Sequence, residues 1–113
     1  MADALLGAAG KRDLGSYFAD TDPGWAGVSS LTILRLVNEI VAESGYKIIN
    51  IDSVIMAQRP RLSPYIKEMR EIIAETLALS VGKIAIKATT TETLGFVGRG
   101  EGIAAQAVCL LHG

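Results

Sequence analysis

The sequence predicts a two-layer α+β domain in which helices cover one face of a mixed β-sheet. Three observations lead to this fold class. Residues 30–44 and 63–79 repeat apolar side chains at helical spacing, residues 47–57 and 83–89 carry the β-branched or alternating pattern of strands, and the two kinds of segment alternate along the chain. The second face of such a sheet also needs a cover, and another copy of the chain could supply it.

Length, composition and charge limit the number of domains and the kinds of partner. A chain of 113 residues forms one domain, and its 50% of hydrophobic residues together with 12 glycines exceed the usual share, which indicates subunit interfaces. With 11 basic and 12 acidic residues the net charge is −1, so nucleic acid is not an expected partner. No apolar stretch reaches the ~18 residues of a membrane span. The single cysteine, Cys109, is typical of a reducing compartment, and a cytoplasmic location is expected.

The first part of the chain is expected to form a short helix followed by a long loop. Residues 3–9 place apolar side chains on one side of a helix, and Gly10 is a suitable stop. These side chains are Leu5, Leu6 and Ala9. Residues 13–29 are rich in Gly, Asp and Pro, which indicates a loop, and a loop of this length in a compact domain is commonly functional.

A longer helix and a strand follow. Ser30 is the expected N-cap of a helix that runs to Ser44, and Gly45 supplies the stop. The apolar side of this helix consists of Leu31, Leu34, Val37 and Val41. Residues 47–57 form a β-branched run, which predicts a strand that is largely covered on both faces.

The second half of the chain predicts another helix and at least one more strand. Ser63 is the expected N-cap and Pro64 the first residue of a helix that continues toward Leu79. Its apolar side consists of Ile66, Met69, Ile73 and Leu77. Residues 83–89 alternate with period two, which predicts a strand. The tail, 103–111, has the alanine content of a helix and the length and position of a strand, and both interpretations stay open.

Most catalytic motifs are excluded. The chain has one histidine and one cysteine, and it contains neither a Gly-x-Ser-x-Gly elbow nor a phosphate-binding P-loop or dinucleotide-binding glycine motif. Cys109 and His112 have the spacing of a zinc-ligand pair, but a zinc site needs three or four ligands. They are therefore interpreted as a core cysteine and a terminal histidine.

Three segments combine small residues with fixed charge in a way that suits phosphate or sugar binding. The first lies in the predicted loop, where carboxylates could bind sugar hydroxyls or a divalent cation. Its candidate residues are Asp13, Leu14, Gly15, Phe18, Ala19, Asp20, Thr21 and Asp22. The alternative is that these aspartates only form Asx turns before Pro23.

The second segment joins the end of a strand to the start of a helix. Free N–H groups at the helix start, together with two arginines, would suit a phosphate or a polar base. Its candidate residues are Ala57, Gln58, Arg59, Pro60, Arg61, Leu62 and Ser63. An ordinary strand-to-helix turn explains the same residues equally well.

The third segment follows the second predicted strand. Consecutive threonine hydroxyls can donate to phosphate oxygens, Glu92 can hold Mg²⁺, and glycines let the backbone approach a ligand closely. Its candidate residues are Ala88, Thr89, Thr90, Thr91, Glu92, Phe96 and Arg99. Thr89 and Glu92 could instead form a capping box, although capping does not explain the glycines that alternate with Arg99 and Glu101.

Taken together, these segments resemble one known family, that of 2-C-methyl-D-erythritol 2,4-cyclodiphosphate synthase, and the resemblance covers essentially the whole chain. It is carried by residues 3–8, 13–15, 18–22, 57–61, 87–92 and 95–103. It implies a homotrimer with its sheets around a three-fold axis and active sites between adjacent subunits. The implied reaction converts 4-diphosphocytidyl-2-C-methyl-D-erythritol 2-phosphate to the cyclic diphosphate and CMP, in non-mevalonate isoprenoid biosynthesis.

The same resemblance implies a role for each segment. Residues 57–63 would hold the cytosine, with Arg61 where relatives often have lysine. Ala88, Thr89 and Thr90 would hold the diphosphate, with Thr90 as the catalytic residue that stabilises the transition state. Glu92 would bind Mg²⁺ or Mn²⁺. Asp13, Gly15 and residues 18–22 would contact the erythritol, while Phe96 and Arg99 would border the phosphates and the channel of the trimer.

The family pattern also places an Asp-x-His pair, a His-Ser pair and a further histidine just upstream of the segment that resembles 3–8. Zn²⁺ is therefore an implied cofactor whose ligands the printed chain does not contain, and residues 1–113 are interpreted as a single domain that is incomplete at its N-terminus. A missing strand pair would leave an unpaired sheet edge.

Three interpretations stay open: an incomplete copy of an active synthase, a zinc-free trimer that binds CMP-like ligands without turnover, and a structural remnant. We expect the chain as given to bind the cytidine end and to cyclise poorly or not at all.

Overall fold

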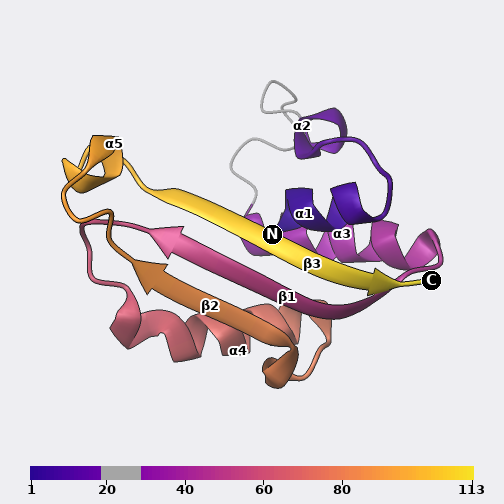
Figure 1. Ribbon diagram of the computed structural model, residues 1–113. Helices are drawn as coiled ribbons and strands as arrows, with labels where there is room; N and C mark the ends of the chain where they lie inside the picture. The colour runs from indigo at the N-terminus through magenta and orange to yellow at the C-terminus, as the bar shows by residue number, and fades with distance from the viewer. Residues whose placement is uncertain (19–28) are drawn as a thin grey trace.

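A computed structural model of the chain describes residues 1–18 and 29–113. Its helices and strands are, in order, α1 (Ala2–Ala8), α2 (Leu14–Tyr17), α3 (Ser30–Glu43), β1 (Lys47–Met56), α4 (Ile66–Leu77), β2 (Ile84–Thr89), α5 (Gly95–Gly98) and β3 (Ala104–His112). The sheet has the order β2-β1-β3, with β2 parallel and β3 antiparallel to β1 (Figure 1). The α+β class and the mixed sheet are confirmed.

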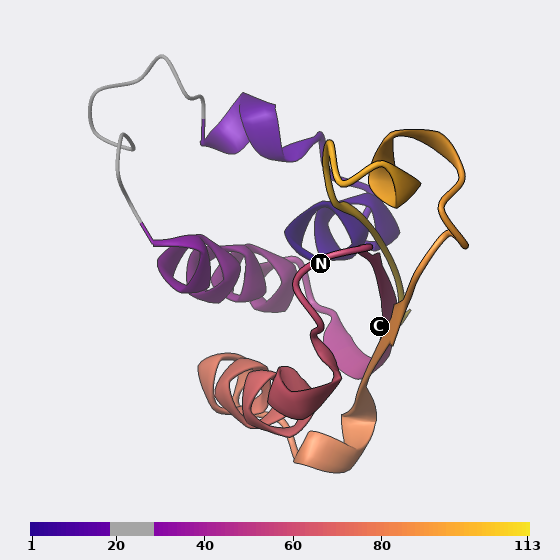
Figure 2. The ribbon, with the colours of Figure 1, turned by 90° about the vertical axis from the view of Figure 1, so that its left-hand side faces the viewer.

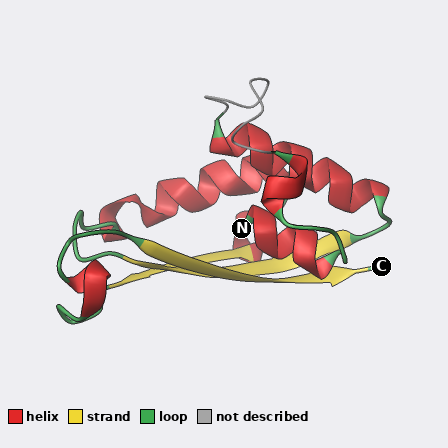
Figure 3. Cartoon of the chain, turned by 90° about the horizontal axis from the view of Figure 1, so that it is seen from above, coloured by secondary structure: helices red, strands yellow, loops and turns green. Residues whose placement is uncertain are grey.

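The helices form the second layer of the fold. Seen along the strands, α3 and α4 lie side by side over one face of the sheet (Figure 2), and the view from above shows this layer separated from the strands (Figure 3). The interior between the layers is apolar, and its largest fully buried side chains are Leu5, Leu6, Val37, Val41, Ile51 and Ile84. The predicted apolar sides of the helices therefore build the core, except that Leu31 is 40% exposed.

Two predictions about helices in the first half were wrong. Ser29, not Ser30, caps α3, because its side chain accepts a hydrogen bond from the Leu31 N–H at 3.2 Å. The predicted loop 13–29 contains the helical turn α2, which Asp13 caps. The end of α3 is as expected, since Gly45 has a φ of +88°.

The boundaries of the second half also differ in detail. Residues Ser63–Tyr65 form a 3₁₀ turn whose N-cap is Leu62, so Ser63 does not cap α4. α4 ends at Leu77, because Ala78 takes the left-handed conformation with φ 55°. The glycine-rich segment contains the short helix α5, and the tail is a strand because it pairs with β1 along its length.

One face of the sheet carries no helix layer. Asp52 and Lys87 form an ion pair between β1 and β2 on this face, while Val108 and Leu110 of β3 are 73% and 56% exposed. Ile49 is 40% exposed as well, so the expectation that the first strand is covered on both faces fails within a single chain. Among the described residues no strand pairs with the second edge of β3. We refer to this surface, defined by Val108, Leu110 and the Asp52–Lys87 pair, as the bare sheet face.

None of the helices in the described ranges 1–18 and 29–113 is long and apolar enough to cross a bilayer. The longest of them, α3, has 14 residues, whereas a span needs ~20.

Candidate functional site

A cleft of about 230 Å³ lies where β1 and β2 end beside the start of α4. It is lined by two of the predicted segments, namely Ala57, Gln58, Pro60, Arg61, Leu62 and Ser63 from the first turn and Ala88, Thr89 and Thr90 from the second. The Ala57 N–H donates to the Thr89 carbonyl at 3.0 Å, which fastens the two segments to each other. Parallel strands bring their carboxyl ends to the same edge of a sheet, and ligands of α/β folds commonly bind there.

The turn after β1 offers both backbone groups and charge. Its Arg59–Pro60 peptide bond is cis, and the Tyr65 N–H donates to the Leu62 carbonyl at 2.9 Å. Arg61 lines the cleft, whereas Arg59 does not, although both were predicted site residues. No described residue forms an ion pair with the Arg61 guanidinium, which leaves its charge available for an anion.

Gln58 contributes an unusual feature to the same cleft. Its Oε1 atom is buried and has no hydrogen-bond partner among the described residues. A buried carbonyl oxygen without a donor costs about 1–3 kcal/mol, so a donor supplied by a ligand or by another chain would offset that cost.

The threonine-rich segment after β2 has a strained backbone. Glu92 and Thr93 have φ values of 54° and 66°, a region that costs non-glycine residues on the order of 1–3 kcal/mol each. Hydrogen bonds hold this loop, because the Glu92 N–H donates to Thr90 Oγ1 at 3.3 Å and Thr91 Oγ1 donates to the Leu94 carbonyl at 2.6 Å. The alternative capping box is not formed, since no helix starts at Thr89.

Gly98 of α5 packs directly on this strained loop. A Cβ atom at Gly98 would lie 2.1 Å from the backbone carbonyl carbon of Thr93 and 2.5 Å from its Cα. Only glycine allows this approach, so α5 and the loop that carries Glu92 are fitted to each other.

The metal-binding capacity of the described residues is limited. Over 1–18 and 29–113 there is no group of three or more His, Cys, Asp or Glu side chains that could hold a metal ion, so these residues do not fit zinc. Mg²⁺ makes fewer demands on the protein, since one or two carboxylates and the substrate's phosphates suffice. Glu92 is exposed and its carboxylate has no partner in the described structure, which fits this second kind of site.

Phe96 and Arg99 lie on or next to α5. Arg99 donates from Nε to Glu101 Oε1 at 2.8 Å and from a second guanidinium nitrogen to Oε2 at 3.1 Å. Phe96 is 51% exposed, and a Cβ atom at Gly102 would lie 3.1 Å from its ring. Both side chains are thus at the surface near the threonine-rich loop, and their contacts with phosphates stay a prediction.

The remaining predicted segment lies elsewhere. Figure 1 shows α2 well away from the ends of β1 and β2, so a single chain does not bring Asp13, Leu14 and Gly15 to the cleft. Phe18 is only 8% exposed and belongs to the core. The other candidates of this segment, Ala19, Asp20, Thr21 and Asp22, lie outside the described residues.

Asp13 is held by the residue three positions later. Its Oδ1 accepts hydrogen bonds from Ser16 Oγ at 2.6 Å and from the Ser16 N–H at 3.2 Å. The side-chain bond contributes most, and the two together lower the pKa of the Asp13 carboxyl below its usual value.

This shift predicts how the cap of α2 responds to acid. Because the folded-state pKa is depressed, the cap contributes fully above the ordinary aspartate pKa of about 3.9 and is lost as the pH falls through the lower folded value. An NMR titration should therefore show the Ser16 amide moving with a midpoint below 3.9. In Asp13→Asn this titration should vanish, and a midpoint at or above the ordinary value would contradict the cap.

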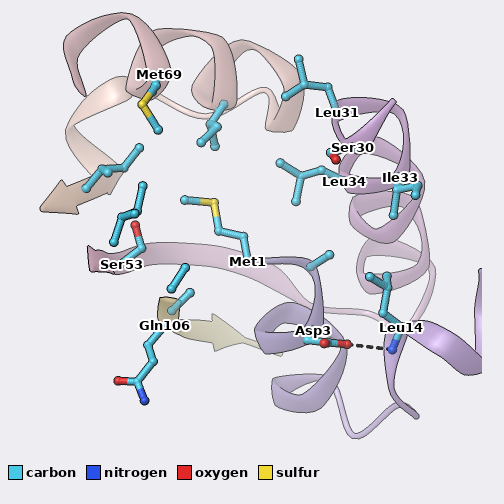
Figure 4. Close-up of a pocket in the computed structure, with 16 residues that line it drawn as sticks. Met1, Asp3, Leu14, Ser30, Leu31, Ile33, Leu34, Ser53, Met69 and Gln106 are labelled. Atoms are coloured by element: carbon cyan, nitrogen blue, oxygen red, sulfur yellow. Dashed lines mark hydrogen bonds between the residues drawn. The ribbon is translucent and has the colours of Figure 1, made fainter. Parts of the chain in front are cut away.

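A larger apolar cavity of about 420 Å³ opens between α1, α3, α4 and the sheet. Figure 4 shows Met1 and Met69 extending into it and Asp3 and Leu14 at one side. Sequence reasoning did not foresee this cavity, nor did it give Asp3 a role, although Asp3 Oδ1 accepts a hydrogen bond from the Leu14 N–H at 2.7 Å. A bond between residues eleven positions apart leaves no periodic signal in the sequence.

Comparisons with known proteins give a consistent result. The family model described as "YgbB family" matches residues 1–112. The chain is 52% identical to the 2-C-methyl-D-erythritol 2,4-cyclodiphosphate synthase of Agathobacter rectalis over 111 residues, which covers 98% of this chain and 63% of the relative. The synthase of the same name from Symbiobacterium thermophilum is 51% identical over 113 residues, which covers 100% of this chain and 72% of the relative.

Solved structures also match. The bifunctional IspDF of Campylobacter jejuni superimposes with a TM-score of 0.94 and 44% identity, covering 97% of this chain and 30% of that chain. The IspF of Plasmodium falciparum, solved as a CDP complex, has a TM-score of 0.84 and 30% identity, covering 97% and 65%. The chain thus spans 63–72% of the length of the two curated relatives.

Proposed function

Because this chain belongs to the YgbB family, we propose that it is a cyclodiphosphate synthase that converts 4-diphosphocytidyl-2-C-methyl-D-erythritol 2-phosphate to 2-C-methyl-D-erythritol 2,4-cyclodiphosphate and CMP. In this reaction an oxygen of the substrate's 2-phosphate attacks the β-phosphorus and the bond from that phosphorus to CMP breaks. The substrate provides its own nucleophile, so the protein needs only to fold it into attack geometry and to stabilise charge. The observation that carries the proposal is the cleft in which residues 57–63 meet residues 88–90.

The turn after β1 would bind the cytidine end. Its peptide groups surround a cleft that suits a flat polar base, and Arg61 adds a positive charge beside it. The CDP complex of the Plasmodium falciparum neighbour supports a cytidine diphosphate as the ligand class.

The threonine-rich loop would bind the diphosphate. Thr89 and Thr90 line the same cleft, and the Thr90 hydroxyl can donate to a phosphate oxygen while its Oγ1 accepts from the Glu92 N–H. This bond keeps Thr90 in place as negative charge develops during the attack. Glu92 would hold Mg²⁺ or Mn²⁺, which when bound neutralises phosphate charge.

A homotrimer would complete the site. The bare sheet face exposes Val108 and Leu110, and exposed apolar surface of this kind marks interfaces. The separation of α2 from the cleft within one chain also supports active sites between adjacent subunits, because Asp13 and Gly15 could then approach the cleft of a neighbouring copy. The role of these residues as erythritol contacts is part of the proposal.

CDP titration tests the cleft. We expect CDP to bind in a calorimetric titration and Arg61→Ala to weaken binding about 10- to 100-fold, since a charge-assisted hydrogen bond contributes about 1.5–3 kcal/mol. Arg59→Ala is the matched control, because Arg59 lies in the same turn but does not line the cleft. Equal losses in both variants would contradict a specific role of Arg61.

Phosphorus NMR tests the reaction. The substrate is incubated with the chain and excess Mg²⁺, and the expected products are CMP and the cyclic diphosphate in equal amounts, formed slowly because the described residues do not fit zinc. CDP binding without product would contradict the synthase proposal and leave a nucleotide-binding protein.

A further inference from the structure

Asp3 connects two helices that the sequence separates by a turn. It lies in the first turn of α1 and is exposed. Its Oδ1 accepts a hydrogen bond from the N–H of Leu14, the first residue of α2, at 2.7 Å (Figure 4). This carboxylate has no place among the residues expected to contact a ligand.

The bond gives a partner to a backbone N–H group that the helix itself leaves unpaired. The first N–H groups of a helix have no partner within it. In α2 the Leu14 N–H donates to the Asp3 carboxylate, and the Ser16 N–H is shared between the carboxylate and the backbone carbonyl of Asp13. At 2.7 Å the bond from the Leu14 N–H has the length of a charge-assisted hydrogen bond, which is stronger than a neutral one. The start of α2 is therefore held from two sides.

The two carboxylates differ in what they leave free. Both bonds from Ser16 end on Oδ1 of Asp13, so no described residue donates to Asp13 Oδ2. A side chain at Gly15 would meet no atom within 4 Å. Asp13 thus offers a free carboxylate oxygen as a hydrogen-bond acceptor, and Gly15 offers backbone with open space around it. The two residues flank Leu14, whose N–H donates to Asp3.

We propose that Asp3 is a positioning residue for the polyol end of the substrate, because it fixes Leu14 and thereby the spacing between Asp13 and Gly15. The inference rests on the proposed function and extends it to a residue that does not touch the ligand. Hydroxyl recognition depends on this spacing, since a displacement of about 1 Å can cost on the order of a hundredfold in rate.

Asp3 can be changed without removing the core of α1. The helix is anchored by Leu5 and Leu6, which are both 0% exposed, whereas Asp3 is at the surface. Removal of the Asp3 carboxylate should therefore leave the Leu14 N–H at the start of α2 without its partner, while the packing of α1 on the sheet stays intact.

The test compares Asp3→Ala with Asp3→Asn in the 113-residue chain, with Glu43→Ala as a control at an exposed acidic position of α3. Two affinities are measured by calorimetry, one for the full substrate and one for CDP, which lacks the erythritol. Asp3→Ala should weaken the full substrate about tenfold and CDP less than twofold. Asp3→Asn keeps an oxygen acceptor and should restore most of the affinity, and amide hydrogen exchange at Leu14 should accelerate only in Asp3→Ala.

The outcomes separate this inference from the proposed function. An unchanged affinity for the full substrate in Asp3→Ala overturns the positioning role, and so does an equal loss of CDP and full substrate, which would mean general destabilisation. A wild-type chain that binds neither ligand overturns both. A wild-type chain that binds the substrate without cyclising it overturns only the proposed reaction, because the affinity comparison and the Leu14 exchange rate still decide the role of Asp3.

Discussion

Glu92→Gln should lower the Mg²⁺-stimulated rate of CMP release by about 10²- to 10³-fold, the loss typical of removing one group that stabilises transition-state charge. The carboxylate is replaced by a neutral amide of the same shape, which is a poor ligand for a hard cation. The loop should keep its conformation, since the Glu92 N–H still donates to Thr90 Oγ1. The measurement is the initial rate as a function of Mg²⁺ concentration.

The matched control is Glu75→Gln, an exposed carboxylate on α4. It should leave both the rate and the Mg²⁺ dependence unchanged. If Glu92→Gln showed the wild-type response to Mg²⁺, Glu92 would not be the metal-binding residue, and the strained loop would need another explanation.

Gly98→Ala should reduce turnover by about a hundredfold through a purely steric effect. The new methyl group would lie 2.1 Å from the Thr93 carbonyl carbon and 2.7 Å from its oxygen, so α5 or the loop must move. Overpacking of this kind costs about 1–3 kcal/mol, and displacement of Glu92 by ~1 Å would lose the attack geometry. Turnover and the amide chemical shifts of residues 91–98 are the measurements.

Gly82→Ala is the control for a general effect of losing a glycine. A Cβ atom at Gly82 meets nothing within 4 Å, so its turnover should match that of the wild type. Gly98→Ala with unchanged turnover and unchanged amide shifts would mean that the approach of α5 to Thr93 is not maintained in solution.

Much of the fold follows from local patterns in the sequence. The faces of α1 and α4 were correctly predicted, because helical periodicity directly reflects which side meets the core. Errors arose where single hydrogen bonds decide a boundary. Asp13 turns part of a Gly- and Asp-rich loop into α2, and Ser29 rather than Ser30 caps α3, since two adjacent serines have the same capping preference.

The candidate site was predictable in part for a similar reason. Two segments that follow successive strands of one sheet meet at its edge, so the cleft between 57–63 and 88–90 is a consequence of topology. The bond from Asp3 to Leu14 and the packing of Gly98 on Thr93 depend on tertiary geometry, which residue types and spacing do not encode. The separation of α2 from the cleft likewise depends on tertiary packing and could not be predicted from residue types and spacing.

The bare sheet face has a thermodynamic consequence for this chain. Val108 and Leu110 gain little from folding while they face water, because the hydrophobic contribution scales with the apolar area removed from solvent. Self-association through this face would add a mass-action contribution to the free energy of unfolding. The melting temperature would then rise with protein concentration, so dilution alone could shift the population toward unfolded chains without any change in sequence, pH or ligand.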